Sequence, residues 1–83
     1  MTREDWMQNF GENLQDILFD KDINQRELSD ITGISTSTIS DYIAGKRMPS
    51  CESIIKIVYA LENIRNGRDV DYFDLLDFGD TID

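Results

Sequence analysis

Two short helical patterns joined by one glycine constrain the fold of this chain more than any other feature. The stretch from Gln25 to Ala44 reads QRELSDITGISTSTISDYIA, and the glycine is Gly33. Glycine adopts the left-handed backbone conformation at no steric cost, so it commonly follows the last turn of a helix. The stretch therefore predicts a helix from Gln25 to about Thr32, a tight turn, and a second helix from Thr36 to Ala44.

The second of these helices has an unusual outer face. Helical spacing predicts that Ile39 and Ile43, with Tyr42 beside them, face the core, as Leu28 and Ile31 do from the first helix. The residues left for solvent or a partner are mostly small and hydroxyl-bearing: Thr36, Ser37, Ser40, Asp41 and Ala44. Such a face suggests a surface that approaches another molecule closely.

Capping residues predict where the helices begin. Asn24 and Ser35 stand immediately before the two helices of the central stretch, and Ser50 stands before another apolar pattern. Side-chain oxygens at this position accept hydrogen bonds from free amides of the first turn. Thr2 followed by Asp5 resembles a capping box, with Asp in place of the usual Glu or Gln.

An amphipathic helix is predicted on each side of the central stretch. Residues 2–19 carry a helical stripe that Gly11 interrupts, and residues 51–62 carry apolar residues at i, i+3, i+4 and i+7. Trp6 is expected to lie beyond the core, free to pack on a partner or on the C-terminal tail. Ile55 and Tyr59 fall off the core face. The two stripes are Trp6, Phe10, Leu14, Ile17 and Leu18, and Ile54, Ile57, Val58 and Leu61.

The C-terminal segment predicts a short fifth helix. Aspartates recur every three residues at 71, 74 and 77, and the opposite side of a helical wheel carries large apolar residues. Asp71 is placed to cap this helix and Gly79 to end it. The apolar residues are Tyr72, Phe73, Leu75 and Leu76.

The acidic charge is concentrated at the two ends of the chain. The net charge of −9 divides into −4 for residues 1–20, +1 for residues 21–68 and −6 for residues 69–83. The total argues against a polyanionic partner. The nearly neutral middle of the chain leaves that possibility open.

The residue types present argue against an enzyme and against a metal or cofactor site. The chain has no histidine, no glycine loop that would cradle phosphate, and one cysteine, Cys51, which has no nearby partner ligand. It also shows neither a signal peptide nor a run of ~18 apolar residues. We expect one soluble cytoplasmic domain over residues 1–83, with no membrane association and with a core over about residues 10–76.

The central stretch and its surroundings resemble the lambda-repressor and Cro type of helix-turn-helix domain, often called XRE-like. This resemblance covers about residues 10–76 and implies a compact, all-α, five-helix fold that binds operator DNA as a dimer. Three residues depart from the family pattern: Ser29, Ile43 and Asp41. The matching elements are Gln25, Glu27-Leu28, Gly33-Ile34-Ser35, Thr38-Ile39-Ser40, Gly45-Lys46-Arg47, Pro49-Ser50, Ile54, Ile57 and Leu61.

The resemblance also implies which residues contact DNA. In this family the helix predicted over residues 36–44 lies in the major groove, with its first residues toward the base edges. Thr36, Ser37 and Asp41 are then the predicted base contacts, although Asp41 has the alternative of pairing within the chain with Lys46, Arg47 or Ser37. The predicted backbone contacts are Gln25, Arg26, Thr38, Ser40, Lys46 and Arg47.

Two functions remain open from the sequence. The first is a sequence-specific regulator of transcription, of phage or mobile-element type, that binds double-stranded DNA as a homodimer. Its alternative is a protein-interaction module on the same fold, antitoxin-like or antirepressor-like, whose acidic termini bind a basic protein. Ile55, Tyr59 and the apolar residues of 72–78 offer surface for dimerisation.

Overall fold

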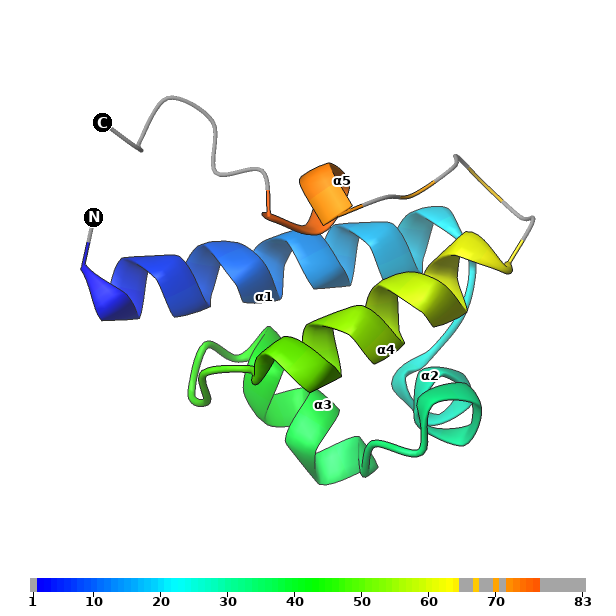
Figure 1. The fold of residues 1–83 in the computed structure, drawn as a ribbon, viewed down its shortest axis with the longest axis horizontal. Helices are drawn as coiled ribbons and strands as arrows, with labels where there is room; N and C mark the ends of the chain where they lie inside the picture. The colour runs from blue at the N-terminus through cyan, green and yellow to red at the C-terminus, as the bar shows by residue number, and fades with distance from the viewer. Residues whose placement is uncertain (1, 65–66, 68–69, 71, 77–83) are drawn as a thin grey trace.

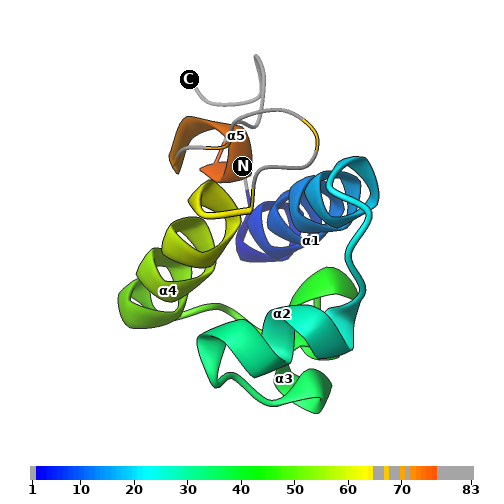
Figure 2. The ribbon, with the colours of Figure 1, turned by 90° about the vertical axis from the view of Figure 1, so that its right-hand side faces the viewer.

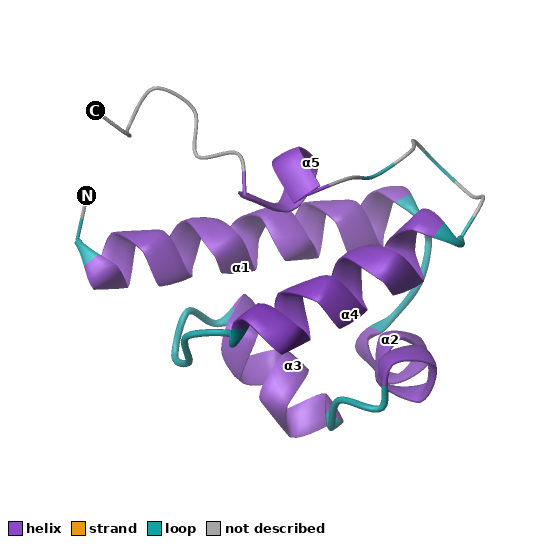
Figure 3. Ribbon diagram, viewed as in Figure 1, coloured by secondary structure: helices purple, strands orange, loops and turns teal. Residues whose placement is uncertain are grey.

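The part of the chain that the structure describes folds into five helices (Figures 1 and 3). The computed structural model describes residues 2–64, 67, 70 and 72–76, and these residues contain no strand. The predicted all-α, five-helix fold is therefore confirmed. The helices are α1 (Arg3–Asp20), α2 (Gln25–Thr32), α3 (Thr36–Ile43), α4 (Cys51–Glu62) and α5 (Tyr72–Leu76).

The predicted capping residues begin the first four helices. Thr2 and Asn24 each form a complete capping box, with Asp5 and Glu27 respectively. Ser35 and Ser50 also accept a hydrogen bond from a first-turn amide. These caps satisfy donors that have no partner inside the helix, which fixes each helix start.

The long helix α1 lies between the other elements. It packs against α3 on one side and against α5 on another, while α2 packs against α3 and α4. Figures 1 and 2 show α2 and α3 together at one side of the molecule and α5 at the opposite side. The shared core consists of Phe10, Leu14, Ile17, Leu18, Leu28, Ile39, Tyr42, Ile57, Val58, Ala60, Leu61, Val70 and Leu75.

Gly11 permits the close contact between α1 and α3. A Cβ atom at this position would lie 2.4 Å from the carbonyl oxygen of Ile43 and 2.5 Å from that of Tyr42. Both atoms belong to the backbone, so no side-chain rotation could make room. The glycine that interrupts the helical stripe is thus the residue at which α3 rests on α1.

Two predictions about apolar residues are wrong. Ile31 was expected in the core, yet 54% of its surface is exposed, because it lies at the rim of the α2–α4 contact beside Tyr59. Trp6 was expected beyond the core, yet it is half-buried and stacks on Phe10 with 5.4 Å between the ring centroids. One turn of helix separates these two rings, which allows the stack.

Lys21 is buried, although it stands between two aspartates, Asp20 and Asp22, in the sequence. Only 1% of its surface is exposed, and its ammonium group donates a hydrogen bond of 2.8 Å to the backbone carbonyl of Ile64. The same residue ends α1, since its amide donates to the carbonyl of Ile17. One buried lysine thus ties the end of α1 to the chain just beyond α4.

The predicted fifth helix is present over Tyr72–Leu76, where the described residues at this end of the chain stop. Leu75 is fully buried, and Asn13 of α1 donates a hydrogen bond of 3.0 Å to its carbonyl oxygen. Asp71, Asp77, Phe78 and Gly79, and the side chains of Tyr72 and Phe73, lie outside the described part of the chain. Among the helices described, none is long and apolar enough to cross a membrane.

Candidate nucleic-acid interface

The turn between α2 and α3 has the geometry that its sequence predicts. Gly33 adopts φ +78°, and its amide donates a hydrogen bond of 2.8 Å to the carbonyl of Ser29. Thr32 supports the turn from the helix side. Its hydroxyl donates to the carbonyl of Leu28 at 2.8 Å and accepts from the amide of Ile34 at 3.1 Å. These bonds fix the direction in which α3 leaves α2.

Buried residues of α3 set its rotation about its own axis. Ile39 is fully buried, and Tyr42 is 4% exposed with its ring edge-on to Phe10 at 6.1 Å. The hydroxyl of Tyr42 donates to Ser53 of α4 at 3.0 Å. These contacts hold one face of α3 in the core and therefore present the opposite face to solvent.

The presented face carries the predicted hydroxyl residues. Thr36, Ser37 and Ser40 are exposed, and Thr38 is half-buried. The hydroxyls of Ser37 and Thr38 lie 3.2 Å and 2.8 Å from that of the capping Ser35. Within the described residues, the hydroxyls of Thr36 and Ser40 have no hydrogen-bond partner, so they are available to a ligand.

Asp41 forms the intramolecular pair that was its alternative to base contact. Its carboxylate lies 3.5 Å from the guanidinium of Arg47, and both side chains are substantially exposed, at 40% and 56%. The pair lies beside the hydroxyl face of α3. Direct base contact by Asp41 stays a prediction.

The remaining basic residues of the predicted interface are exposed. Arg26 lies in the first turn of α2, and Lys46 follows the end of α3. Neither forms an ion pair with any residue that the structure describes. Lys56, on α4, is instead paired with Glu52 at 3.0 Å. Arg26 and Lys46 are thus the cations of this region that carry no internal counter-ion within the described residues.

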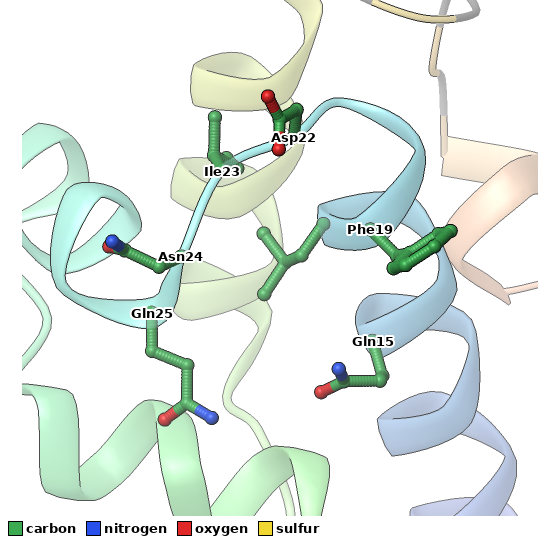
Figure 4. A pocket seen from close by; sticks show the side chains of 7 residues that line it. Gln15, Phe19, Asp22, Ile23, Asn24 and Gln25 are labelled. Atoms are coloured by element: carbon green, nitrogen blue, oxygen red, sulfur yellow. The ribbon is translucent and has the colours of Figure 1, made fainter.

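A pocket of about 460 Å³ opens where α1 meets the start of α2 (Figure 4). Gln25, the predicted phosphate contact at the start of α2, directs its amide group into this opening, and Gln15 of α1 does so from the facing side. Phe19, which is 85% exposed, lies at the same pocket. Gln15 was not predicted, because no spacing in the sequence shows that its turn of α1 approaches α2.

A second depression, of about 270 Å³, lies between α2 and α4. It is lined by Ile31 and Tyr59 among others, and Tyr59 is 70% exposed. Ile55, on the same helix as Tyr59, is 47% exposed. The residues predicted to lie off the core face of α4 are therefore exposed as expected.

Comparison with known proteins agrees with this geometry. The fold resembles the high-resolution crystal structure of the restriction-modification controller protein C.AhdI from Aeromonas hydrophila, with a TM-score of 0.72 and 23% sequence identity. The match covers 83% of this chain and 94% of that one. No curated protein matches the sequence.

A family model described as helix-turn-helix matches residues 18–62, which is more than half of the chain. The matched range contains α2, the turn at Gly33, α3 and α4. The chain belongs to this lambda-repressor-like helix-turn-helix family, whose members are DNA-binding regulators of transcription.

Proposed function

We propose that this protein regulates transcription by binding a specific operator in double-stranded DNA as a homodimer, in the manner of phage or mobile-element repressors. The observation that carries the proposal is the exposed hydroxyl face of α3. Its residues are held at a fixed rotation by Ile39 and Tyr42, and the hydroxyls of Thr36 and Ser40 have no hydrogen-bond partner among the described residues. A helix presented in this way fits the major groove.

Base recognition is assigned to Thr36 and Ser37, with Asp41 as a further candidate. A hydroxyl both donates and accepts, and a threonine methyl packs against that of thymine. Backbone contacts are assigned to Gln25, Arg26, Thr38, Ser40, Lys46 and Arg47. We add Gln15, because its amide faces the same pocket as that of Gln25 (Figure 4).

The position of α5 supports DNA binding by so acidic a chain. This helix lies on the side of the molecule opposite α2 and α3 (Figures 1 and 2). Asp74, which belongs to α5, therefore lies on a part of the molecule remote from α3. The repulsion between its charge and phosphate is correspondingly weak at physiological salt, where the Debye length is about 8 Å.

Selection from a random duplex library tests the proposal. Wild type is expected to enrich one sequence motif at about 100 mM salt, and Thr36→Ala combined with Ser37→Ala is expected to weaken binding to that motif. The matched control is Gln8→Ala combined with Asn9→Ala, which removes two uncharged polar side chains from α1 and should leave binding unchanged. A wild type that enriches no motif would refute the proposal. A stoichiometric basic partner recovered without DNA would favour the interaction module.

The homodimer is assigned to the exposed apolar residues of α4. Ile55 and Tyr59 offer a surface next to the depression that Ile31 lines. A two-fold dimer would place its half-sites about one helical turn of DNA apart. Sedimentation should show a dimer for wild type and dissociation for Ile55→Ser combined with Tyr59→Ser. A wild-type monomer at high concentration would contradict this assignment.

A further inference from the structure

The loop that follows α3 returns toward the helix it has just left. Gly45 adopts φ +73°, its amide donates to the carbonyl of Tyr42 at 3.1 Å, and the amide of Lys46 donates to the carbonyl of Asp41 at 2.8 Å. These two bonds are those of the Schellman motif, which reverses the chain at a helix end. The reversal places the next residue, Arg47, beside the last turn of α3.

This reversal creates the ion pair between Arg47 and Asp41. The two residues are six positions apart, which is too far for a pair within one turn of a straight helix. The turn nevertheless brings the guanidinium to 3.5 Å from the carboxylate, in a hydrogen bond from Nη2 to Oδ2. The pair is thus produced by the backbone geometry of the Gly45 turn.

The pair contributes little to the fold itself. Both side chains are substantially exposed, and exposed ion pairs are largely screened by water and salt. Its location is more informative than its strength. It lies at the hydroxyl face of α3, where a DNA phosphate would compete with Asp41 for the same guanidinium.

We propose that Asp41 is a specificity-determining residue that acts through Arg47: its carboxylate substitutes for phosphate in the free protein and thereby lowers the affinity for non-specific DNA. This inference rests on the proposed DNA-binding function. On a random duplex, Arg47 gains a phosphate only by leaving Asp41, so the exchange brings no net charge neutralisation. On the operator, the lost ion pair is replaced, because Asp41 can accept a hydrogen bond from the amino group of a cytosine.

The effect has a measurable size. Each phosphate that a protein neutralises adds about 0.9 to the slope of log K against the logarithm of salt concentration. Asp41→Asn should therefore steepen the slope for a random duplex by about 0.9. At about 0.1 M salt, a change of this size in the slope corresponds to a rise in non-specific affinity of up to about eight-fold. Operator affinity should rise less, so the specificity ratio should fall.

Two comparisons separate this mechanism from a general loss of negative charge. Asp30→Asn removes the same charge from an exposed position of α2 that forms no ion pair with any described residue. It should change the slope and the non-specific affinity far less than Asp41→Asn does. In an Arg47→Gln background, Asp41→Asn should behave like this control, since the guanidinium on which it acts is absent.

The experiment measures binding of these variants to the selected operator and to a random duplex over a range of salt concentrations, with circular dichroism to verify folding. Non-additivity between Asp41→Asn and Arg47→Gln on the random duplex supports the inference. Additive effects overturn it, as does equal behaviour of Asp41→Asn and Asp30→Asn. Weaker operator binding with unchanged non-specific binding would make Asp41 a base reader only. A wild type without any preferred sequence refutes the proposed function instead.

Discussion

Replacing Gly11 with alanine tests the packing that fixes the position of α3. Gly11 lies inside α1, so helix propensity alone predicts that alanine stabilises the protein by about 1 kcal/mol. The structure predicts instead that alanine at this position destabilises the protein. The added methyl would lie 2.4 Å from the carbonyl oxygen of Ile43, about an ångström closer than an ordinary contact.

The size of the effect follows from what must move. The clashing atoms are backbone atoms at the end of α3, so the whole helix must shift to relieve them. Overpacking of this kind costs about 1–3 kcal/mol, and the propensity gain offsets part of it. We expect a net loss of about 1–2 kcal/mol, which corresponds to a decrease in Tm of about 4–16 °C for a domain of this size.

The assay is thermal unfolding followed by circular dichroism, with Gly33→Ala as the matched control. No atom lies within 4 Å of a Cβ at Gly33, so that variant is affected only by its φ of +78°. Gly33→Asn should have a Tm close to that of wild type and above that of Gly33→Ala, because asparagine tolerates this conformation. No residue substituted for Gly11 can recover in that way. An unchanged or raised Tm for Gly11→Ala would refute the close contact between α1 and α3.

Three further substitutions each remove one hydrogen-bonding side-chain group, and chemical denaturation measures the effect on stability. Ser35→Ala removes the cap of α3 and should lower the free energy of unfolding by about 1 kcal/mol; no loss would contradict the capping role. Lys21→Met removes the buried donor to the carbonyl of Ile64 and should cost about 1–3 kcal/mol, whereas a neutral result would show that the ammonium is not needed there. Tyr42→Phe removes the bond to Ser53 and should cost about 0.5–1.5 kcal/mol, and a stabilised variant would argue against that bond.

Local signals predicted the helix starts and the turns well. Thr2, Asn24, Ser35 and Ser50 cap their helices, and Gly33 takes the left-handed conformation, because each of these features depends on neighbouring backbone groups alone. The hydroxyl face of α3 is exposed for a similar reason. The apolar residues of the same helix occupy its buried side, so the hydroxyl residues lie on the side that faces solvent.

Features that depend on how far neighbouring helices extend could not be predicted. Ile31 has the spacing of a core residue, but α4 does not cover it completely. The chemistry of Lys21 suggests solvent, but its ammonium finds a carbonyl from a distant part of the chain. The approach of Gln15 to Gln25 and the pairing of Asp41 with Arg47 likewise depend on tertiary geometry and on a reversed loop.

The two faces of α3 have a consequence for how this protein can diversify. The side chains that hold the helix, Ile39 and Tyr42, are distinct from those of the exposed Thr36 and Ser40, whose hydroxyls form no hydrogen bond within the described residues. Exchange of these exposed residues is therefore nearly free of a folding penalty. New binding preferences are accessible to descendants of this chain, or to a designer, by single substitutions that leave the scaffold intact.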